Sequence, residues 1–408
     1  MPQALEGSQA IARAVALCRP QVVAAYPITP QTHIVENIAK LVADGALECE
    51  YVSVESEHSA ASVVLGAAAA GARAYTASAS QGILLMGEVL YNIAGLRIPL
   101  VLTCANRALS APLSIWNDQQ DSMAVRDAGW IQLYCAGNQE AVDTTIQAFR
   151  ITQETELPVM VCVDGFTLTH TLEPIELPSQ EDVDRFLPPF RFARALDPAQ
   201  PLSLGTLVSP DWFTEARHSQ HGALFAAAAN IEAADADWAA LTGRAWGGLL
   251  EVDGPAAARI GILTLGSISG TLQDARAAWP DLPPVRLLRL RAFRPFPAAA
   301  LRAACEGLET LVVLERALSP GGGGIVTAEL CAALYGLDAA PAVRGFAVGL
   351  GGRDVPLETY RRAVAAALAP EGGEFAVLDV DLDKLPEADR YPEAGPCAAP
   401  PVDSESSR

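Results

Sequence analysis

Lysine is nearly missing from this chain of 408 residues: Lys40 and Lys384 are the only two, and arginine supplies the other basic residues. Basic residues are also outnumbered, 28 against 48 acidic ones, which gives a formal net charge of −20. This balance argues against a nucleic-acid backbone or an anionic membrane surface as the partner. It does not exclude a local anion site, because a single arginine in a cleft can bind an anion.

Long apolar runs and closely spaced cysteines are missing too. No segment of about 18 apolar residues is free of charges and helix breakers, and the N-terminus does not resemble a secretion signal, so we expect neither a membrane span nor export. No two of the eight cysteines lie closer than 26 positions. Without a C-x-x-C pair, an iron–sulfur cluster or structural zinc held by this chain is not expected, and reduced thiols in a cytoplasm are. The five histidines show no metal-binding spacing, and we expect no metal ligand among them.

What is present is a regular alternation of short β-rich runs and Ala-rich helical stretches. In residues 1–175 it predicts an α/β domain with a doubly wound, mostly parallel sheet. The expected strands are 22–26, 49–54, 72–78, 99–104, 132–136 and 158–163. The expected helices are 32–44, 59–70, 82–95 and 140–155.

The remaining chain divides into three parts. Residues 176–255 begin rich in proline and acidic groups and continue with helical patterns, so we expect a linker and a packed connector. The α/β alternation resumes in residues 256–385 and predicts a second domain, while residues 386–408 are expected to form a flexible tail. The strands of the second domain are expected at 259–265, 285–290, 311–315 and 343–348, and the helices at 269–278, 297–305 and 325–335.

Ligands of doubly wound sheets bind beyond the carboxyl ends of the strands, so the polar residues that follow each strand are the candidates. Thr29 follows the first strand in a turn fixed by two prolines. It is either a hydroxyl aimed at a site or an ordinary helix N-cap. Glu57 follows the second strand and precedes a helix of small residues. It is either a desolvated functional carboxylate or a helix-start carboxylate that interacts with the dipole.

Arg107 follows the fourth strand in a long loop with few charges. It is either a fork for a carboxylate or phosphate, or a surface arginine paired with Asp118 or Asp121. After the third strand, residues 78–82 form a turn of small residues that a ligand can approach closely. A hydroxyl, an acid, an open turn and a cation together fit a small anionic substrate and a cofactor.

At this point the residues show a resemblance. The runs AYPITPQT, ESEHSAASVVLGAAAAGARAYTASASQG, NRALSAPLSIWNDQQDSM and VDGFTLTHTLEPIELP, in this order, resemble the α subunit of pyruvate:ferredoxin oxidoreductases, within the 2-oxoacid:acceptor oxidoreductase family. The later runs FRPFP, VLERALSPGGGG and GLGGRDV are similar to the second domain of that subunit. The resemblance covers roughly residues 5–380. It implies a pyrimidine-type thiamine diphosphate domain followed by a domain like the C-terminal domain of transketolase.

The resemblance also implies roles for individual residues. Glu57 matches the glutamate that hydrogen-bonds the aminopyrimidine ring of thiamine and thereby promotes ionisation of the thiazolium carbon. Glu55 is not the matching acid, since the motif places the acid beside the small-residue helix. Thr29 and Arg107 match substrate contacts, in which Thr29 donates a hydrogen bond and Arg107 binds the carboxylate of the 2-oxoacid. The remaining cofactor contacts that it implies are Tyr26, Pro27, Ile28 and Ile115.

Motifs that are absent define what partners must supply. Thiamine enzymes bind the diphosphate through Mg²⁺ on a G-D-G motif, and the nearest strings here, at Asp164 and Asp253, lack its first glycine. The resemblance therefore implies a separate β chain for the diphosphate and Mg²⁺, a ferredoxin-like chain with 4Fe-4S clusters, a γ chain, and coenzyme A as co-substrate. Gly321–Gly324 is either a phosphate cradle at a helix start or a turn needed for packing, and we favour the turn.

Several alternatives remain open from the sequence. Pyruvate is the first choice of substrate, but another 2-oxoacid, branched-chain or aryl such as phenylglyoxylate, fits the same residues. The electron acceptor is ferredoxin, or NAD through an added flavoprotein. A non-catalytic scaffold subunit is a second hypothesis, which the joint presence of Thr29, Glu57 and Arg107 disfavours. A self-sufficient α/β enzyme is a third, which lacks a complete phosphate or metal motif.

Overall fold

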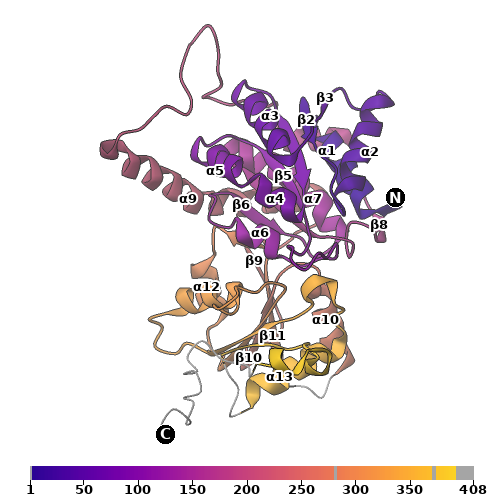
Figure 1. Ribbon diagram of the computed structural model, residues 1–408, viewed down its shortest axis with the longest axis vertical. Helices are drawn as coiled ribbons and strands as arrows, with labels where there is room; N and C mark the ends of the chain where they lie inside the picture. The colour runs from indigo at the N-terminus through magenta and orange to yellow at the C-terminus, as the bar shows by residue number, and fades with distance from the viewer. Residues whose placement is uncertain (1, 280–282, 370–373, 392–408) are drawn as a thin grey trace.

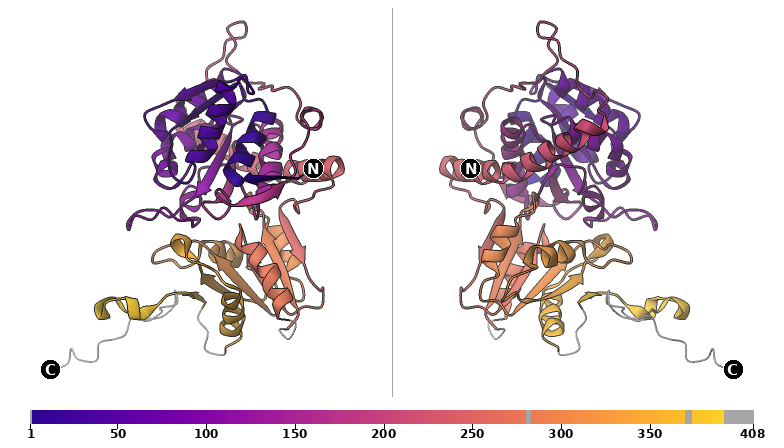
Figure 2. Two further views of the ribbon diagram at one scale, coloured as in Figure 1. Left: turned by 90° about the vertical axis from the view of Figure 1, so that its right-hand side faces the viewer. Right: turned by 90° about the vertical axis from the view of Figure 1, so that its left-hand side faces the viewer.

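The computed structural model describes residues 2–279, 283–369 and 374–391. They form two α/β units, one above the other in Figure 1, and Figure 2 shows the same stacking from two sides. A flexible tail is expected at residues 386–408, and residues 392–408 of it lie outside the described residues. The start of this segment contains a short 3-10 helix, η3 (Glu387–Asp389). No helix in the described ranges has the length and apolarity to cross a bilayer.

The first unit is built on a seven-stranded sheet with the order β12-β6-β7-β5-β4-β2-β3. All its strands run parallel except β12, which pairs antiparallel with β6. The strands are β2 (Val22–Ala25), β3 (Glu50–Ser53), β4 (Ala74–Ser78), β5 (Val101–Asn106), β6 (Ile131–Tyr134), β7 (Val159–Asp164) and β12 (Ala292–Arg294). The predicted parallel sheet is confirmed, with an added edge strand from the second half of the chain.

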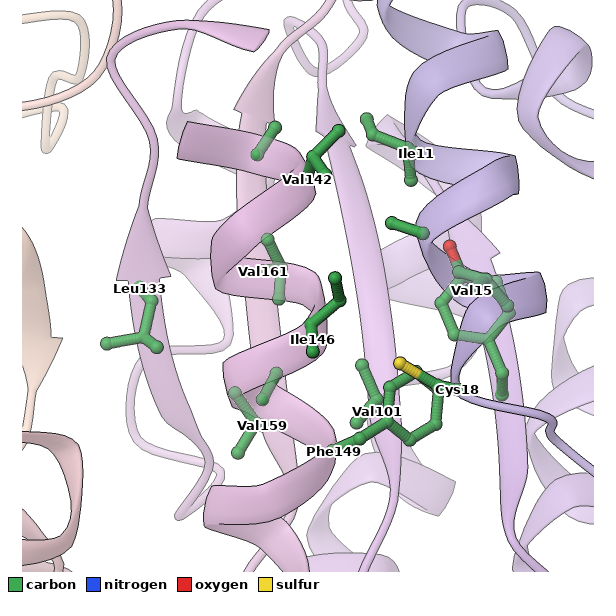
Figure 3. Close-up of a cluster of buried hydrophobic side chains, with 14 of the residues drawn as sticks. Ile11, Val15, Cys18, Val101, Leu133, Val142, Ile146, Phe149, Val159 and Val161 are labelled. Carbon is green, nitrogen blue, oxygen red and sulfur yellow. The ribbon is translucent and has the colours of Figure 1, made fainter. Parts of the chain in front are cut away.

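Helices cover both faces of this sheet, as expected for a parallel sheet that is buried on both sides. They are α1 (Gly7–Leu17), α2 (Thr32–Ala43), α3 (Glu57–Ala69), α4 (Ser80–Leu85), α5 (Gly87–Gly95), α6 (Gln120–Ala124) and α7 (Asn138–Thr155). Figure 3 shows α1 and α7 lying side by side, with Ile11 and Ile146 packed toward Val101 and Val161 of the sheet. The expected helix 82–95 is divided into α4 and α5 at Met86.

Two short strands lie apart from the main sheet. β1 (Gln3–Glu6) and β8 (Leu172–Ile175) pair antiparallel, with Glu6 opposite Leu172. This pairing joins the start of the chain to the segment that leaves β7, and it brings Glu6 beside the turn that precedes β8.

The segment between the units is mostly helical. After α8 (Gln180–Phe186), the helix α9 (Pro210–Thr242) runs for 33 residues. Its C-terminal half packs on α7 and buries Trp238 completely, whereas its first ten residues, 210–219, are exposed. In Figure 1 this exposed end projects away from the body of the molecule. Strand β9 (Leu250–Asp253) lies within the segment expected to be connector, but it pairs antiparallel with β11 of the second sheet.

The second unit contains a six-stranded sheet with the order β15-β14-β13-β10-β11-β9. Its other strands are β10 (Ile260–Thr264), β11 (Val285–Leu290), β13 (Thr310–Glu315), β14 (Ala342–Ala347) and β15 (Phe375–Val377). Its helices are α10 (Ile268–Ala278), α11 (Ala298–Ala304), α12 (Ile325–Leu334) and α13 (Leu357–Leu368), and η1 (Leu350–Gly352) is a short 3-10 turn.

One of the buried apolar clusters is shared by the two units. It runs from Met123 and Met160 in the first unit to Leu263 and Val313 in the second. Strand β12 extends this connection, because it leaves the second unit to join the first sheet. The joint between the units is therefore packed, and loops from both sides meet there.

Candidate active site

The carboxyl ends of β2, β4 and β5 are neighbours in the sheet, so the loops that follow them lie together. Arg107, which directly follows β5, connects two of these segments. Its Nη1 donates to the backbone carbonyl of Thr29 at 2.9 Å, and its Nε donates to the carbonyl of Ser114 at 3.0 Å. The structure thus brings together Thr29 and Arg107, which lie 78 positions apart in the sequence.

Arg107 is buried rather than on the surface, with 7% of the residue exposed. Its guanidinium makes no hydrogen bond with the carboxylates of Asp118 or Asp121 among the described residues, so the interpretation as a paired surface arginine is wrong. Burial lowers the pKa of Arg107, and the nearby charge of Asp121 opposes this effect. Within the described chain Nη2 makes no hydrogen bond, which leaves one arm of the fork available to an anion.

Asp121 organises the loops around this arginine. Its fully buried carboxylate accepts hydrogen bonds from the backbone N–H of Ser80 at 2.8 Å, from that of Arg107 at 3.0 Å and from the amide of Asn106 at 2.7 Å. Burial raises the pKa of Asp121, while these donors act to lower it. Sequence reasoning considered Asp121 only as a partner of the guanidinium; its actual partners are backbone N–H groups, which no spacing rule reveals.

Thr29 lies in an exposed turn and does not start the helix that follows. Helix α2 begins at Thr32, with Gln31 at its N-cap position, so the interpretation of Thr29 as an N-cap is wrong. The fully buried Gln31 holds the turn: its Nε2 donates to the carbonyl of Ala77 at 2.7 Å and its Oε1 accepts from the N–H of Ile28 at 3.2 Å. The hydroxyl of Thr29 makes no hydrogen bond among the described residues. It is free to meet a ligand.

Apolar side chains expected at the cofactor lie around this turn and on the loop after β5. Tyr26 is 39% exposed and Ile115 is 40% exposed, while Pro27 is exposed and Ile28 is half-buried. Exposed apolar side chains beside a row of strand ends leave this side of the site open within the chain.

Glu57 is the first residue of α3, and it is buried with only 6% exposed. The preceding Ser56 caps the helix by accepting from the N–H of Ser59 at 3.2 Å. Glu55 points outward instead and accepts from the hydroxyl of Ser59. The carboxylate of Glu57 accepts no hydrogen bond from the described residues, and its oxygens are not among the fully buried unpartnered atoms, so they remain accessible from outside the chain.

The side chain of Glu57 packs against a glycine, Gly82 of helix α4. A Cβ on Gly82 would stand 2.7 Å from Oε1 of Glu57 and would also collide with the hydroxyl of Ser78. That hydroxyl is buried and has no partner. Together these groups form a small cradle with an acid, an unpaired hydroxyl and a bare backbone, built by the end of β4 and the starts of α3 and α4.

The second unit holds the loop that carries Ile115 and Trp116. The backbone N–H of Gly351 donates to Asp118 at 3.2 Å, and Gly352 packs so closely against Trp116 that a Cβ would collide with it. Burial raises the pKa of Asp118 to about 7. The run GLGGRDV, expected only as a loop of the second domain, therefore supports the site loop of the first.

The two aspartates in the strings nearest to a G-D-G motif have structural partners. Asp164 is buried and accepts from the N–H of Ser267 at 2.8 Å and from Nε2 of Gln119 at 3.1 Å, which ties the end of β7 to the second unit. Asp253 forms an ion pair with Arg276. Both aspartates therefore act as structural links.

The glycine turn before α12 is a packing feature. Glu315 is fully buried and accepts from the N–H of Val326 at 2.8 Å and of Thr327 at 3.1 Å, so the donors of the helix start are already used. Burial raises the pKa of Glu315, and these hydrogen bonds oppose the shift. A Cβ on Gly324 would collide with the same carboxylate. The phosphate-cradle interpretation is wrong, and the packing turn is confirmed.

Sequence comparisons agree with this architecture. Residues 13–235 match the family described as pyruvate flavodoxin/ferredoxin oxidoreductase, thiamine diP-bdg, and residues 258–360 match pyruvate:ferredoxin oxidoreductase core domain II. The pyruvate synthase subunit PorA of Methanothermobacter thermautotrophicus is 46% identical over 370 residues, which is 90% of this chain and 95% of that protein. The ketoisovalerate oxidoreductase subunit VorA of Pyrococcus abyssi is 39% identical over 361 residues, 86% of this chain and 89% of that protein.

Solved structures support the fold. A 2-oxoglutarate:ferredoxin oxidoreductase from Magnetococcus marinus has a TM-score of 0.69 at 20% identity, and the match covers 90% of this chain. It covers 65% of the solved chain, so this chain spans less than two thirds of that neighbour's length. A split-gene transketolase has a TM-score of 0.52 at 13% identity, covering 90% of this chain and 97% of the solved one. With its family matches and its close sequence relatives, the chain belongs to the α subunits of the pyruvate:ferredoxin oxidoreductase family.

Proposed function

We propose that this chain is the α subunit of a multi-subunit 2-oxoacid:acceptor oxidoreductase that acts on pyruvate. The reaction converts pyruvate and coenzyme A to acetyl-CoA and CO₂ and passes the released electron pair to oxidised ferredoxin. The observation that carries the proposal is the placement of a buried, donor-free Glu57 and a buried Arg107 with one free arm at the same edge of the sheet.

The cradle around Glu57 fits the aminopyrimidine end of thiamine diphosphate. A ring nitrogen requires a hydrogen-bond partner, and the carboxyl of Glu57 lacks one within the described chain. The buried hydroxyl of Ser78 needs a partner as well, and Gly82 leaves the ring room to approach. Thiamine diphosphate, when bound, supplies the carbon nucleophile for attack on a 2-oxoacid and accepts the electrons released by decarboxylation. The role of Glu57 is to form a hydrogen bond with the ring nitrogen through its carboxyl group.

Arg107 and Thr29 are suited to bind the substrate. The free arm of the Arg107 fork offers charged N–H donors to the carboxylate of a 2-oxoacid, and burial strengthens this interaction. The hydroxyl of Thr29, beside it in the turn, can donate to an oxygen of the same substrate. Asp121 and Gln31 serve as positioning residues, because they fix the backbone of both loops without lying at the open edge.

We assign the remaining parts of the reaction to partner chains. The described residues contain no G-D-G motif, and Asp164 and Asp253 are committed to structural contacts, so the diphosphate and Mg²⁺ are assigned to a β chain. Iron–sulfur clusters are assigned to a ferredoxin-like chain, since the described cysteines are free and scattered, and a γ chain completes the assembly. These free thiols also support a reducing compartment, and we place the protein in the cytoplasm.

Pyruvate is preferred because relatives at 41–46% identity are named pyruvate synthase, whereas those named for ketoisovalerate reach 38–39%. The test is to capture the complex from its host through a tag on this chain and to measure CoA-dependent reduction of ferredoxin. We expect the highest kcat/KM with pyruvate. Higher values with 3-methyl-2-oxobutanoate or phenylglyoxylate would reassign the substrate, and the complete absence of 2-oxoacid-dependent reduction would favour a scaffold.

A further inference from the structure

The fold gathers three side chains that are far apart in the sequence. Glu6 ends β1, His33 is the second residue of α2, and His170 lies in the turn before β8. One ligand atom of each, a carboxylate oxygen or a ring nitrogen, lies within 4.8 Å of the others. Among the residues that the structure describes, no other group of three His, Cys, Asp or Glu side chains meets this spacing.

We propose that Glu6, His33 and His170 form a binding site for a divalent transition metal of the Zn²⁺ class. Two imidazole nitrogens and one carboxylate oxygen are the donors that Zn²⁺, Co²⁺, Ni²⁺ and Fe²⁺ bind well. Mg²⁺ and Ca²⁺ prefer oxygen donors alone and would gain little from this set. The site is separate from the cradle of Glu57 and from the Mg²⁺ assigned to a partner chain.

The geometry of the group needs little change to accept a metal. Nδ1 of His33 lies 2.6 Å from Oε1 of Glu6, and the rings of His33 and His170 have centroids 4.5 Å apart. Two ligand atoms on one metal stand about 2.9 Å apart in octahedral and about 3.3 Å apart in tetrahedral coordination. Glu6 and His33 must therefore separate by a few tenths of an ångström, and both can move because their side chains are 28% and 46% exposed.

A supporting contact holds the third ligand. Nδ1 of His170 lies 2.8 Å from the hydroxyl of the fully buried Thr169, which also accepts from the N–H of Phe166 at 2.8 Å. A hydroxyl oxygen can accept from both groups, and in that state Nδ1 of His170 carries the proton and Nε2 is left for the metal. Metal-binding histidines commonly have such an outer partner on the second nitrogen.

The site adjoins the candidate active site through a row of rings. The ring of His170 lies 4.7 Å from that of Phe166, and Phe166 lies 4.6 Å from Trp116 on the loop beside Ile115. A metal bound to His170 would therefore restrain the ring against which Phe166 packs, and Phe166 in turn contacts Trp116. Solvent access to Glu6 and His33 leaves further coordination positions for water.

The test uses the full chain, stripped of metal by a chelator and dialysed against Zn²⁺, with the bound metal measured by mass spectrometry. We expect about one Zn²⁺ per chain. His33→Gln and His170→Gln should each weaken binding by more than about 100-fold, and Thr169→Val by about tenfold, the effects of losing a ligand and an outer partner. His33 is half exposed, so its variant should fold, which circular dichroism would verify.

Two controls separate this site from other donors. Cys331→Ser removes an exposed thiol, and His221→Ala removes one of two histidines three positions apart on α9. Both variants should bind Zn²⁺ like the unmodified chain. Co²⁺ in the site should show ligand-field bands without a thiolate charge-transfer band. Zn²⁺ binding that survives His33→Gln, or that disappears with Cys331→Ser, would overturn the proposal, as would the absence of stoichiometric binding by the unmodified chain.

Discussion

The carboxylate of Glu57 lies directly against the α-carbon of Gly82, at a place where a Cβ would stand 2.7 Å from Oε1. The two residues come from helices that follow different strands, α3 after β3 and α4 after β4. Gly82 therefore sets the position of the proposed acid, because it has no side-chain carbon that would push the carboxylate away. It is a positioning residue that only the three-dimensional contact reveals.

Gly82→Ala should displace Glu57, because a contact of this length is not compatible with a methyl group. A displacement of about 1 Å at a reacting group lowers rates by about 100-fold, and we expect kcat of the assembled complex to fall by about that factor. Overpacking should also reduce the free energy of unfolding by about 1–3 kcal/mol. The measurement is the steady-state rate of ferredoxin reduction, together with urea unfolding of the isolated chain.

Gly87→Ala is the matched control for this substitution. Gly87 begins α5, five positions along the chain, and a Cβ there meets no atom within 4 Å. Alanine is favoured over glycine in a helix by about 1 kcal/mol, so the control should keep full activity and equal or higher stability. Equal activity of the two variants would show that the contact between Gly82 and Glu57 does not matter for the reaction.

Glu57→Gln keeps the shape of the side chain and removes its ionisable proton. In the assembled complex we expect proton exchange at the thiazolium carbon to slow by about 10²- to 10⁴-fold, the usual contribution of a positioned acid or base. Glu55→Gln is the control, since Glu55 points outward and contacts the hydroxyl of Ser59. Hydrogen–deuterium exchange of the bound cofactor, followed by NMR after rapid quenching, makes the comparison. Unchanged exchange in Glu57→Gln would remove the role assigned to this residue.

Arg107→Ala should chiefly impair substrate capture. Loss of a charged fork to a buried carboxylate costs about 2–4 kcal/mol, which corresponds to a fall in kcat/KM for pyruvate of about 30- to 700-fold. Arg107→Lys keeps the charge but loses the fork, so its kcat/KM for pyruvate should lie between those of the unmodified complex and Arg107→Ala. Arg126→Lys is the control, because the contacts of Arg126 lie away from Thr29 and Ser114: it donates to the carbonyl of Met123 at 2.9 Å and forms an ion pair with Glu329 at 3.9 Å. If kcat fell while KM for pyruvate stayed constant, Arg107 would not be a substrate-binding residue.

Asp118 should make the stability of the chain depend on pH. Burial raises its pKa in the folded chain to about 7, from the ordinary value of 3.8, so the folded state retains a proton that the unfolded state has released. The free energy of unfolding contributed by this group therefore falls as pH rises through this window. Relative to Asp118→Asn, the unmodified chain should lose about 2–3 kcal/mol between about pH 5 and pH 8. Urea unfolding of both proteins at the two pH values measures this loss. A stability difference between the two proteins that does not vary with pH would contradict the assignment.

The sequence was sufficient to predict the parallel sheet because its strands are short apolar runs, each followed by a helix with clear breakers. It was not sufficient for β12 and β9. Each is a strand of three or four residues whose partner is antiparallel and lies elsewhere in the chain. Such a strand has no periodicity of its own, and only the folded chain shows its partner, which is β6 of the first sheet for β12 and β11 of the second sheet for β9.

The candidate site shows the same division. Glu57, Thr29 and Arg107 could be proposed from their positions after strands, and the resemblance gave them roles. The contacts of Asp121, Gln31 and Gly82 could not be proposed, because backbone donors and a missing Cβ leave no pattern in the sequence. The histidine group was missed for a related reason, since the pairing of β1 with β8 brings together residues that no local spacing connects.

The central claim is that this chain supplies one half of a thiamine diphosphate site that partner chains complete. Native mass spectrometry of the complex, captured from its host through a tag on this chain, tests that claim most directly. The account predicts additional chains, the mass of thiamine diphosphate and the mass of iron–sulfur clusters in the same assembly. A lone or self-paired chain without cofactor would contradict it.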